Sequence, residues 1–570
     1  MLNRIADLLE IKGENFYKIR AYREAVRQLD NLSVEVEDLI RQGKLKDVPG
    51  IGSAIEQKIV EFVERGHLEF LDRLEAEIPP ALLDLTRVPG LGPRTAKEIY
   101  DGLHILSLDA LEEAAREERL RKLPGIKART EENILKGIAM LRRTENKIYF
   151  PQALELAGSL IAALRDIRGV RRAEIAGSLR RRKETVRDLD ILVAGDEPAG
   201  LSRKFAALPQ VTEVIGQGDT RCSIRVRSGM QVDLRAVTPE SFGAAWQYFT
   251  GSQAHNVQLR ARAERLGKLK INEYGVFRED GSRIAGDTEE EVYRAVGCAW
   301  IPPEIREGRG EIEAAASGEL MRLIEEKDLQ GDLHTHSNWS DGRNEIAVMA
   351  QAAASRGYSY MVLTDHTQSL QIAGGLTPER FRQRDLEIAT VNASMADFRV
   401  LRGAEVDILP DGRLDLPDEL LADLDLVIAS VHTALDQPAE EMTQRVLRAV
   451  RSPHVDVLGH PTCRRLDRRG ETAVDLDRVI AEAVRCRTAL EINSSPMRLD
   501  LNDSWARRAQ EAGAMLAIDS DSHYPAEFDY APFGCAIARR AGLTKERVLN
   551  TRKAPELLAY CAEKASKSHV

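Results

Sequence analysis

Seven short apolar runs alternate with helical segments over residues 331–570, and this alternation constrains the fold more than any other feature of the sequence. The runs are GDLHTH, YMVLTDH, FRVLRGAEVD, LDLVIASVH, VDVLGHP, ALEINSS and MLAIDSDSH. Strands that are each followed by a helix pair in parallel and can close into a barrel, because every crossover returns the chain to the same end of the sheet. We therefore expect a distorted seven-stranded α/β barrel in this part of the chain.

Histidine and carboxylate side chains follow these strands at the ends where α/β barrels carry their chemistry. Six of the seven strands supply candidate metal ligands, which are His334, His336, Asp341, His366, Glu405, His432, His460, Asp521 and His523. So many ligands exceed the needs of one ion, and we expect two or three ions with Glu405 as the bridge. Imidazole together with carboxylate suits Mn²⁺ or Zn²⁺, and such ions activate water against a phosphoester. His454 opens its strand and is expected at the surface.

Two aspartates in the middle of the chain, Asp188 and Asp190, lie two residues apart on an apolar strand and so face the same way. Asp233, on the later strand QVDLR, is the candidate third member. Like charges that face one another are unfavourable without a cation between them. Three hard carboxylates can hold two Mg²⁺ (or Mn²⁺) ions for in-line phosphoryl displacement. The turn just upstream offers donors to a phosphate from Gly177, Ser178 and Arg181.

A short Gly/Pro pattern recurs before three helices of the N-terminal part, as VPGIG at 48–52, VPGLG at 88–92 and LPGIK at 123–127. The pattern looks like a helix-hairpin-helix motif, whose glycines let backbone N–H groups approach a DNA phosphate. Such contacts position a protein on DNA without reading its sequence. The third copy is degenerate because Lys127 replaces the second glycine. The candidate DNA-binding glycines are Gly50, Gly52, Gly90 and Gly92.

The order GSLRRR…DLDILV, continued by WQYFTGS at 246–252 and INEY at 271–274, resembles the nucleotidyltransferase signature of family X DNA polymerases. The barrel motifs HxH…D, TDH, GxE, SxH, GHP and DxH resemble the polymerase and histidinol phosphatase (PHP) family. Together they are similar to a bacterial-type family X DNA polymerase. The resemblance implies that Asp188, Asp190 and Asp233 are the catalytic metal ligands of a palm. It implies a nucleotide site formed by Gly177, Ser178, Arg181, Tyr248, Phe249, Gly251, Asn256 and Arg260.

The same resemblance implies an order of domains. They are a lyase-like helical module at 1–80, fingers at 81–145, a nucleotidyltransferase palm at 146–237, a thumb of mixed α+β structure at 238–310, a linker at 311–330 and the PHP barrel at 331–570. In the lyase-like module, Lys58 matches the lysine that forms a Schiff base with a 5′-deoxyribose phosphate. Lys18 and Tyr22 match the neighbouring phosphate pocket. Ala54 stands where lyase members often carry another lysine, a change that weakens phosphate binding or catalysis.

The implied function is the filling of short gaps during DNA repair. The barrel would act as a 3′-5′ exonuclease, a 3′-phosphatase or an abasic-site endonuclease. The implied partners are gapped or nicked DNA and deoxynucleoside triphosphates. Two alternatives stay open: a barrel that is mainly a phosphatase of small molecules, and a DNA-binding scaffold with a weak palm.

The composition sets limits on partners and location. Lys+Arg 81 against Asp+Glu 91 gives a net charge of −10, which excludes a uniformly basic nucleic-acid coat but not local basic patches. No apolar run reaches the ~18 residues that a membrane helix needs. The six cysteines form no CxxC pair, which fits a reducing compartment. We expect a cytoplasmic protein without membrane partners that functions as a monomer.

Overall fold

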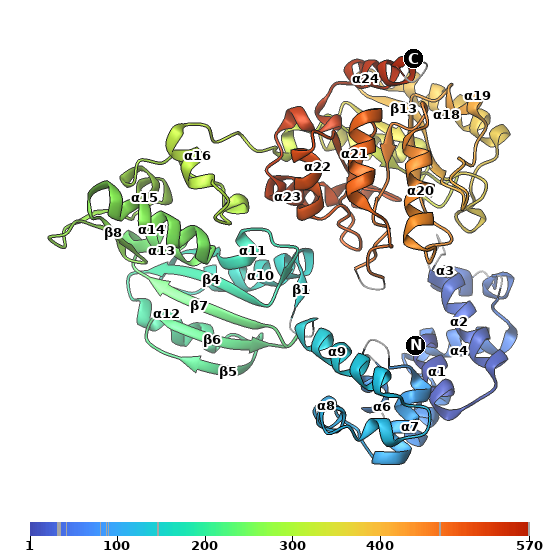
Figure 1. Ribbon diagram of the computed structural model, residues 1–570, viewed down its shortest axis with the longest axis horizontal. Helices are drawn as coiled ribbons and strands as arrows, with labels where there is room; N and C mark the ends of the chain where they lie inside the picture. Colours follow the sequence, from blue (N-terminus) through green and yellow to red (C-terminus); the bar gives the residue numbers. More distant parts are fainter. Residues whose placement is uncertain are drawn as a thin grey trace. The chain divides into compact units, whose positions relative to one another are not determined.

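The computed structural model describes residues 1–30, 36–41, 43–48, 50–79, 81–86, 88, 91–144, 147–466 and 469–567. The chain divides into two compact units, Met1–Lys147 and Ile148–Val570. Each unit is described by itself below, and both are drawn in Figure 1. Among the described residues, no helix is both long enough and apolar enough to cross a membrane.

The described residues of the first unit form helices and short turns, as the helical spacing of its apolar residues predicts. Each helix buries one apolar face, and Ile5, Leu8 and Leu9 of the first helix are at most 1% exposed. The helices are α1 (Leu2–Lys12), α2 (Phe16–Asp30), α3 (Val36–Arg41), α4 (Ser53–Arg65), α5 (Glu69–Glu77), α6 (Ala81–Leu85), α7 (Pro93–Leu103), α8 (Leu108–Arg116) and α9 (Ala128–Thr144).

The second unit begins with a five-stranded mixed sheet in the order β2-β4-β7-β6-β5, labelled in Figure 1. Its strands are β2 (Val170–Ile175), β4 (Asp188–Gly195), β5 (Val211–Gln217), β6 (Arg221–Val226) and β7 (Gln231–Val237), and a short pair β1 (Ile148–Tyr149) and β3 (Thr185–Val186) lies apart. The sequence analysis predicts β4 and β7, the strands that carry the aspartates, whereas β5 has no such signal. That edge strand exposes every residue after Val211, so it lacks the apolar alternation that marks a half-buried strand.

Helices cover both faces of this sheet. The alternate residues Leu189, Ile191 and Val193 of β4 pack with α10 (Phe150–Arg165) and α12 (Pro198–Ala206) in one apolar cluster. Leu192 and Ala194 point the other way and pack against α13 (Phe242–Thr250). A strand alternates its side chains between two faces, so Asp188 and Asp190 lie on the face that α13 covers.

A small α+β region follows the sheet. It contains α14 (Gln253–Gly267), the three-stranded sheet β10-β9-β8, α15 (Glu289–Ala295) and α16 (Glu311–Ser317). The strands are β8 (Lys270–Asn272), β9 (Gly275–Phe277) and β10 (Arg283–Ala285). The segment 311–330, expected as a linker, is packed at both of its ends, whereas most residues from 317 to 322 are exposed. Ile312 and Ala315 of α16 belong to the core of this region, whereas Ile324 and Leu329 belong to the barrel core. Its charged composition conceals these regularly placed apolar side chains.

The rest of the chain forms the barrel that the sequence predicts. Seven strands lie in the order β11-β12-β13-β14-β15-β16-β17, and each described pair is parallel. A parallel bridge between Thr335 and Ser522 brings the first strand to the last. The strands are β11 (Gly331–Thr335), β12 (Tyr360–Leu363), β13 (Arg399–Asp407), β14 (Leu426–Ser430), β15 (Val457–Leu458), β16 (Ala489–Asn493) and β17 (Leu516–Asp519).

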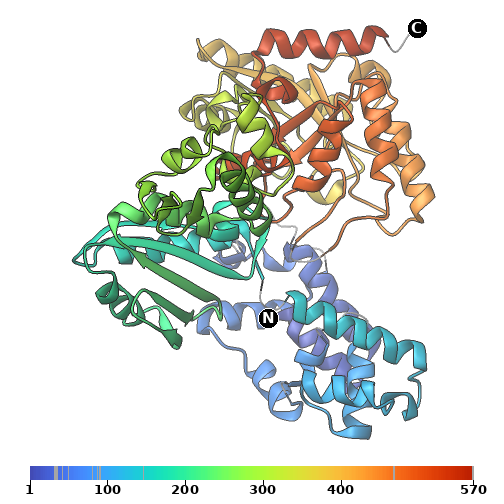
Figure 2. The same ribbon diagram turned by 60° about the vertical axis from the view of Figure 1, so that its left-hand side comes forward.

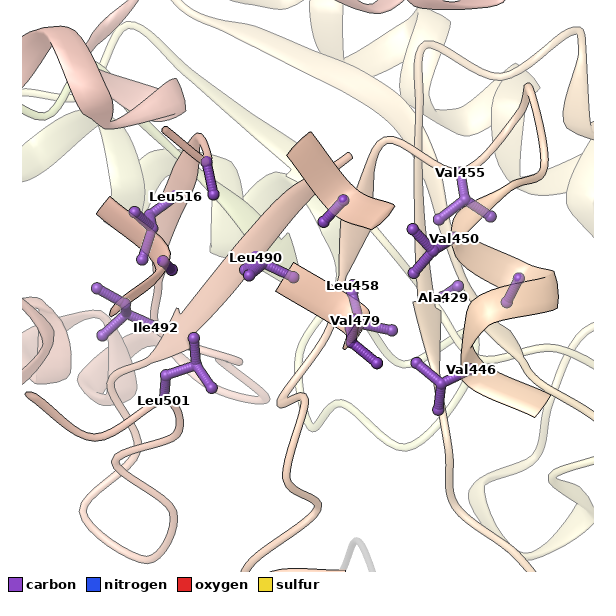
Figure 3. Packing of buried hydrophobic residues seen from close by; sticks show 14 of the residues in the cluster. Ala429, Val446, Val450, Val455, Leu458, Val479, Leu490, Ile492, Leu501 and Leu516 are labelled. Carbon is purple, nitrogen blue, oxygen red and sulfur yellow. The ribbon is translucent and has the colours of Figure 1, made fainter. Parts of the chain in front are cut away.

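Helices surround this barrel, as Figure 1 shows for its orange and red part. They are α17 (Ile346–Ser355), α18 (Pro378–Ser394), α19 (Asp418–Leu421), α20 (Ala439–Val450), α21 (Leu476–Cys486), α22 (Asp503–Glu511), α23 (Ala531–Ala541) and α24 (Ala554–Lys567). Figure 3 shows Val446 and Val450 of α20 and Val479 of α21 packed among side chains of the strands.

The last helix, α24, runs past one end of the barrel in Figure 2. Its residues Leu557 and Tyr560 pack against Leu426, Val457 and Ala489. These three residues are the first of their strands. The helix therefore closes the N-terminal end of the barrel, and the C-terminal ends of the strands, where the predicted ligands lie, form the opposite end.

Candidate active sites

The three aspartates of the middle sheet meet on one face of two neighbouring strands. Asp188 and Asp190 lie on β4, and the parallel register of β4 and β7 sets Asp190 directly opposite Asp233. All three are half-buried. Asp233 is held by Gln231, whose Nε2 donates to Oδ2 at 3.0 Å, and by the Ser223 hydroxyl. The structure thus brings together the three carboxylates that the strand pattern predicts.

A glycine lets the next turn of chain approach these acids. Gly177 begins the short helix α11 (Gly177–Arg180) with a φ of +59°, and a Cβ atom there would lie 1.9 Å from Oδ2 of Asp190. The N–H of Ala176 also donates to the Asp190 carbonyl oxygen at 2.8 Å. Only glycine fits this close approach. It brings α11 and Ser178, which is half-buried, to the edge of the acidic cluster.

The negative charges of Asp188, Asp190 and Asp233 are not fully offset by positive charges nearby. Burial and the neighbouring Asp188 and Asp233 raise the pKa of Asp190 to about 7. Burial also raises the pKa of Asp188, and the nearby Asp233 adds to this. A carboxylate whose charged form is disfavoured in this way is stabilised by a cation. Oxygen ligands of this kind suit Mg²⁺ or Mn²⁺, so the residues present fit a divalent metal site.

The predicted nucleotide residues surround the end of α13. The Tyr248 and Phe249 rings lie edge to face with their centroids 5.2 Å apart. Asn256 is held in place, because its Nδ2 donates to the Tyr248 carbonyl at 2.8 Å and its Oδ1 accepts from Gln247 at 2.9 Å. Arg260, one turn further along α14, is exposed.

Arg181 is buried beside this group rather than free in a solvated loop. Its Nε lies 3.3 Å from Oε1 of Glu307, and its Nη1 donates to the Thr250 carbonyl oxygen. Gly251 adopts a φ of +65°, and a Cβ there would lie 3.4 Å from Nη1 of Arg181. The structure therefore places the Arg181 guanidinium beside the turn at Thr250 and Gly251.

A buried ion pair that the sequence does not reveal supports the same region. Arg180 donates to Glu289 through two bonds of 2.7 and 2.6 Å, and Arg306 donates to the same carboxylate at 2.7 Å. The Arg180 guanidinium also lies 3.3 Å from the centre of the Trp246 ring. Arg180 and Glu289 are 109 positions apart, and neither belongs to a motif that would have paired them.

Two of the predicted hairpin glycines are exposed at the N-termini of helices. Gly52 is the N-cap of α4 and Gly92 is the N-cap of α7. Both are exposed, and no heavy atom beyond their chain neighbours lies within 4 Å of where a Cβ would be. Gly50 has a φ of +81°, which few other residues adopt. Gly90 lies outside the described residues.

Lys58 has a specific environment on α4. Its Nζ donates to the Ala54 carbonyl at 2.9 Å and lies 4.9 Å from the centre of the Phe70 ring, which Lys18 also approaches at 5.8 Å. Burial, and then the neighbouring Lys18, lower the pKa of Lys58. Tyr22 is 4% exposed and belongs to the helical core, because its position on α2 faces inward. Burial of this ring does not favour the phosphate contact predicted for it.

In the barrel, the predicted ligands converge at the C-terminal ends of the strands. Glu405 lies at the centre. Its carboxylate is 2.9 Å from His366 Nδ1, 3.0 Å from His460 Nε2, 3.2 Å from His432 Nε2 and 3.3 Å from His334 Nε2. A carboxylate that reaches four imidazoles with its two oxygens is placed to bridge metal ions, as the sequence predicts.

The barrel ligands form three sets, and within each set the ligand atoms all lie within 4.8 Å of one another. The sets are His336, Asp341, His366 and His523; His334, His336 and Asp521; and His366, Glu405 and His432. His460, the ninth predicted ligand, joins them through Glu405. Among the described residues, no other such set is found, so the acids of the middle sheet form a looser group.

Several buried imidazole nitrogens in the barrel make no well-directed hydrogen bond, even where a Glu405 oxygen is near. They are His334 Nε2, His336 Nδ1 and Nε2, His366 Nδ1 and His460 Nδ1. Buried polar atoms are nearly always satisfied, so these atoms fit metal ligands. Burial and the neighbouring His523 and His366 lower the pKa of His336 to about 4, which keeps the ring neutral, as a metal ligand must be.

Two further carboxylates orient the ligands and were not predicted. Glu491 Oε1 lies 2.6 Å from His334 Nδ1, and Asp407 Oδ1 lies 2.8 Å from His432 Nδ1. Such contacts fix the ring orientation and leave the other nitrogen for the metal. Glu491 lies on β16, the strand without a predicted ligand. A glutamate inside the apolar run ALEIN is the signal that could have identified it. Cys463 and His454 belong to none of the ligand sets.

Family models match four parts of the chain. They describe a helix-hairpin-helix domain at residues 1–68, a SAM-like helix-hairpin-helix tandem at 82–139, a DNA polymerase beta thumb at 245–307 and a PHP domain at 332–495. Between the second and third lies the sheet with the three aspartates. These matches confirm the predicted hairpin modules, thumb and barrel.

Some relatives match nearly the whole chain, and others match about two fifths of it. "Probable phosphatase" proteins from Thermoanaerobacter sp. and Shewanella sediminis are each 29% identical and cover 41% and 42% of this chain and 96% and 95% of their own. The "DNA polymerase/3′-5′ exonuclease PolX" of Bacillus subtilis is 37% identical over 563 residues, 98% of both chains. Because that likeness runs through hairpins, sheet, thumb and barrel alike, the chain belongs to the PolX family of bacterial family X DNA polymerases with a PHP domain.

Proposed function

We propose that this protein fills short gaps in DNA during repair and also removes 3′ nucleotides with its barrel. The observation that carries the proposal is the presence of two separate clusters of possible metal ligands, the three aspartates on β4 and β7 and the set around Glu405, in one chain with hairpin modules. Gapped or nicked DNA and deoxynucleoside triphosphates are the proposed substrates. We expect a monomer in the cytoplasm.

In the palm, Asp188, Asp190 and Asp233 would hold Mg²⁺ or Mn²⁺. A pair of such ions polarises the attacking hydroxyl and stabilises the charge that develops on the leaving group. Arg181 and Ser178 would bind the triphosphate, since a guanidinium matches phosphate oxygens well. The Tyr248 and Phe249 pair would border the sugar, and Asn256 would face the incoming base. Arg260 would contact the template side.

In the barrel, the nine predicted ligands would hold two or three Mn²⁺ or Zn²⁺ ions, which supply an activated water and a Lewis acid for phosphoester cleavage. Glu405 would join neighbouring ions. Glu491 and Asp407 would keep His334 and His432 in the orientation for binding. The same centre could serve a 3′-phosphatase or an abasic-site endonuclease, because each reaction cleaves a phosphoester of DNA.

One labelled primer on single-nucleotide-gapped DNA tests both halves of the proposal in the presence of Mn²⁺. We expect the primer to lengthen with nucleotides and to shorten without them. Lengthening alone would contradict the exonuclease assignment and leave phosphatase or abasic-site cleavage for the barrel. Shortening alone would mean that the palm only holds DNA.

The barrel could instead be a small-molecule phosphatase, and its likeness to the "Probable phosphatase" proteins supports this second reading. The hairpins, with Gly52 and Gly92 exposed at helix N-termini, favour DNA. Comparing kcat/KM on a labelled DNA 3′ end with kcat/KM on a free sugar or amino-alcohol phosphate separates the two. Faster turnover of the small substrate would reject the DNA reading.

A deoxyribose-phosphate lyase is a further candidate activity of the first unit. The lowered pKa of Lys58, caused by burial and by Lys18, favours it, because an uncharged amine attacks an aldehyde. Borohydride should trap the wild-type protein on a 5′-deoxyribose-phosphate end, and Lys58→Ala should not be trapped. The matched control is Lys136→Ala, which removes an exposed lysine from α9. Equal trapping of Lys58→Ala and wild type would place the reactive amine elsewhere.

A further inference from the structure

One barrel side chain reaches the turn that carries the nucleotide residues of the palm. Arg540 lies on α23 and is 6% exposed. Its Nη1 donates to the Arg181 carbonyl oxygen at 2.7 Å and lies 3.2 Å from Oε1 of Glu307. From the barrel side, Asp503 on α22 accepts from Nε of Arg540 at 2.9 Å. The Arg540 guanidinium is therefore held by Asp503 of the barrel, and it holds the turn at Arg181 of the palm.

The surrounding interface is packed and paired in the same way. Arg539 Nε donates to Glu304 Oε1 at 2.8 Å, and Arg182 Nε lies 3.3 Å from the same oxygen. Phe533 of α23 meets Phe150 of α10 edge to face with the ring centroids 5.9 Å apart. This close packing leaves no freedom for the turn to move away from α23 without breaking buried contacts.

The turn held by Arg540 is the end of α11, a four-residue helix whose other end touches the acidic cluster. Arg182 takes the left-handed conformation with a φ of +55°, which residues other than glycine adopt only where their surroundings impose it. At the start of the helix, Gly177 lies against the Asp190 carboxylate. Because α11 is so short, a shift of the Arg181 backbone moves Ser178 and Gly177 as well.

Glu307 adds a second path to the same place. Its Oε1 lies 3.3 Å from Arg181 Nε and 3.2 Å from Arg540 Nη1, so one oxygen joins the palm cation to the barrel cation. Two like charges close together require this acid between them. Removing the acid takes one partner from the Arg181 guanidinium, and removing Arg540 takes the partner of the Arg181 carbonyl oxygen. Either change loosens the turn that carries Arg181.

We propose that Arg540 is a positioning residue for nucleotide incorporation, through which the barrel holds α11 and Arg181 in place for the palm. Arg540 is not one of the nine predicted metal ligands, so this support is separate from the chemistry of the barrel. The proposal rests on the proposed function of the palm. It means that polymerisation depends on a folded barrel even when the barrel's own centre is inactive.

The test compares wild type with Arg540→Met, which keeps much of the apolar stem and removes the guanidinium. Incorporation of one nucleotide and 3′ shortening are measured on the same gapped DNA. We expect nucleotide kcat/KM to fall about tenfold to a hundredfold, as for a buried charged hydrogen bond, chiefly through KM. The shortening rate should change less than about twofold. Arg540→Lys keeps the positive charge but has one cationic group for three acceptors. Its nucleotide kcat/KM should lie between those of wild type and Arg540→Met.

Two further variants separate positioning from general stability. Arg478→Met removes an exposed barrel ion pair, that of Arg478 with Glu440 at 2.7 Å, and should leave both activities unchanged. Glu307→Gln should raise the nucleotide KM as Arg540→Met does, and the double variant should lose less than the product of the two effects.

Unchanged nucleotide KM in both Arg540→Met and Glu307→Gln would overturn the proposal. The proposal would also be overturned if both activities fell together and the thermal midpoint of unfolding fell with them, because Arg540 would then only stabilise the fold. A wild-type protein that incorporates no nucleotide would reject the proposed function, and this inference with it. An active wild type with unaffected variants would reject this inference alone.

Discussion

The palm and the barrel both gather acidic side chains on neighbouring strands, but they balance the charge in different ways. The palm has three half-buried carboxylates and no imidazole. Burial and the two neighbouring acids raise the pKa of Asp190 to about 7, and Arg235 and Arg181 offset this only in part. In the barrel, Glu405 is 1% exposed and touches four imidazoles. The barrel therefore holds a complete ligand set before any substrate arrives.

The two sites differ in how closely the protein alone brings their ligands together. No set of palm side chains lies as tightly together as the three barrel sets within 4.8 Å, and its oxygens leave room for phosphate and water around a hard cation. Under the proposed function, the nucleotide would complete the coordination in the palm. The barrel site is assembled by the fold, with Glu491 and Asp407 behind its imidazoles. The predictions below test this distinction, from the largest effect to the smallest.

The largest effect is expected from Asp190→Asn, which keeps the shape beside Gly177 and removes the charge. Synthesis should fall about a thousandfold or more, because metal stabilisation of the transition state contributes several kcal/mol and each 1.4 kcal/mol is about tenfold. Exonuclease activity should be retained. Asp196→Asn, at the other end of β4, where Asp196 pairs with exposed Arg171, is the matched control. Loss of both activities in Asp190→Asn would indicate one shared site.

His336→Ala should produce the reverse pattern. His336 belongs to two of the three ligand sets, so its loss should lower exonuclease activity about a hundredfold or more, the upper end of what even supporting residues of metal sites contribute. Synthesis on gapped DNA should stay within about twofold. His454→Ala, which changes a half-buried histidine outside those sets, is the control. Exonuclease activity that survives His336→Ala would reject the barrel assignment.

Much of both sites could be predicted because strand geometry carries local information. The spacing of Asp188 and Asp190 fixes their common face, and the barrel ligands all follow strands at corresponding ends. What could not be predicted depends on pairs of residues far apart in sequence. Arg540 and Arg181 are 359 positions apart, and Glu491 lies 157 positions from His334. No spacing rule joins such residues before the fold is known.

The role of Gly177 shows a second limit. Its place before Ser178 predicts a phosphate-binding turn, and the structure adds that a side chain there would collide with Asp190. The sequence motif does not distinguish these two needs, since glycine serves both. Likewise, the charged composition of 311–330 suggests a linker, whereas Ile324 is fully buried in the barrel core. Packing partners, rather than composition, decide these cases.

Removing the metal should separate the sites by stability. Because the barrel ligands are buried and preformed, each bound ion should stabilise the fold by mass action, about 2.7 kcal/mol at a hundred times its Kd. Calorimetry should therefore show a lower thermal midpoint of unfolding after treatment with EDTA, restored by Mn²⁺ or Zn²⁺. His336→Ala should reduce this shift and Asp190→Asn should not. Equal shifts in wild type and His336→Ala would show that the stabilising ions bind elsewhere.

The smallest effect is a pH dependence confined to the palm. Burial and the neighbouring Asp188 and Asp233 raise the pKa of Asp190 to about 7, so below that pH a proton competes with the metal for this carboxylate. The Mg²⁺ concentration for half-maximal synthesis should fall as pH rises from 6 to 7, by up to about tenfold for one proton, and level off above. The stability of the metal-free protein should change in the unfavourable direction. Its free energy of unfolding should fall as pH rises through about 7, because the folded protein must then ionise Asp190. Titrating Mg²⁺ at fixed nucleotide concentration between pH 6 and 8.5 measures the first effect. A Mg²⁺ requirement that does not change with pH would mean that the palm acids are as well balanced as those of the barrel.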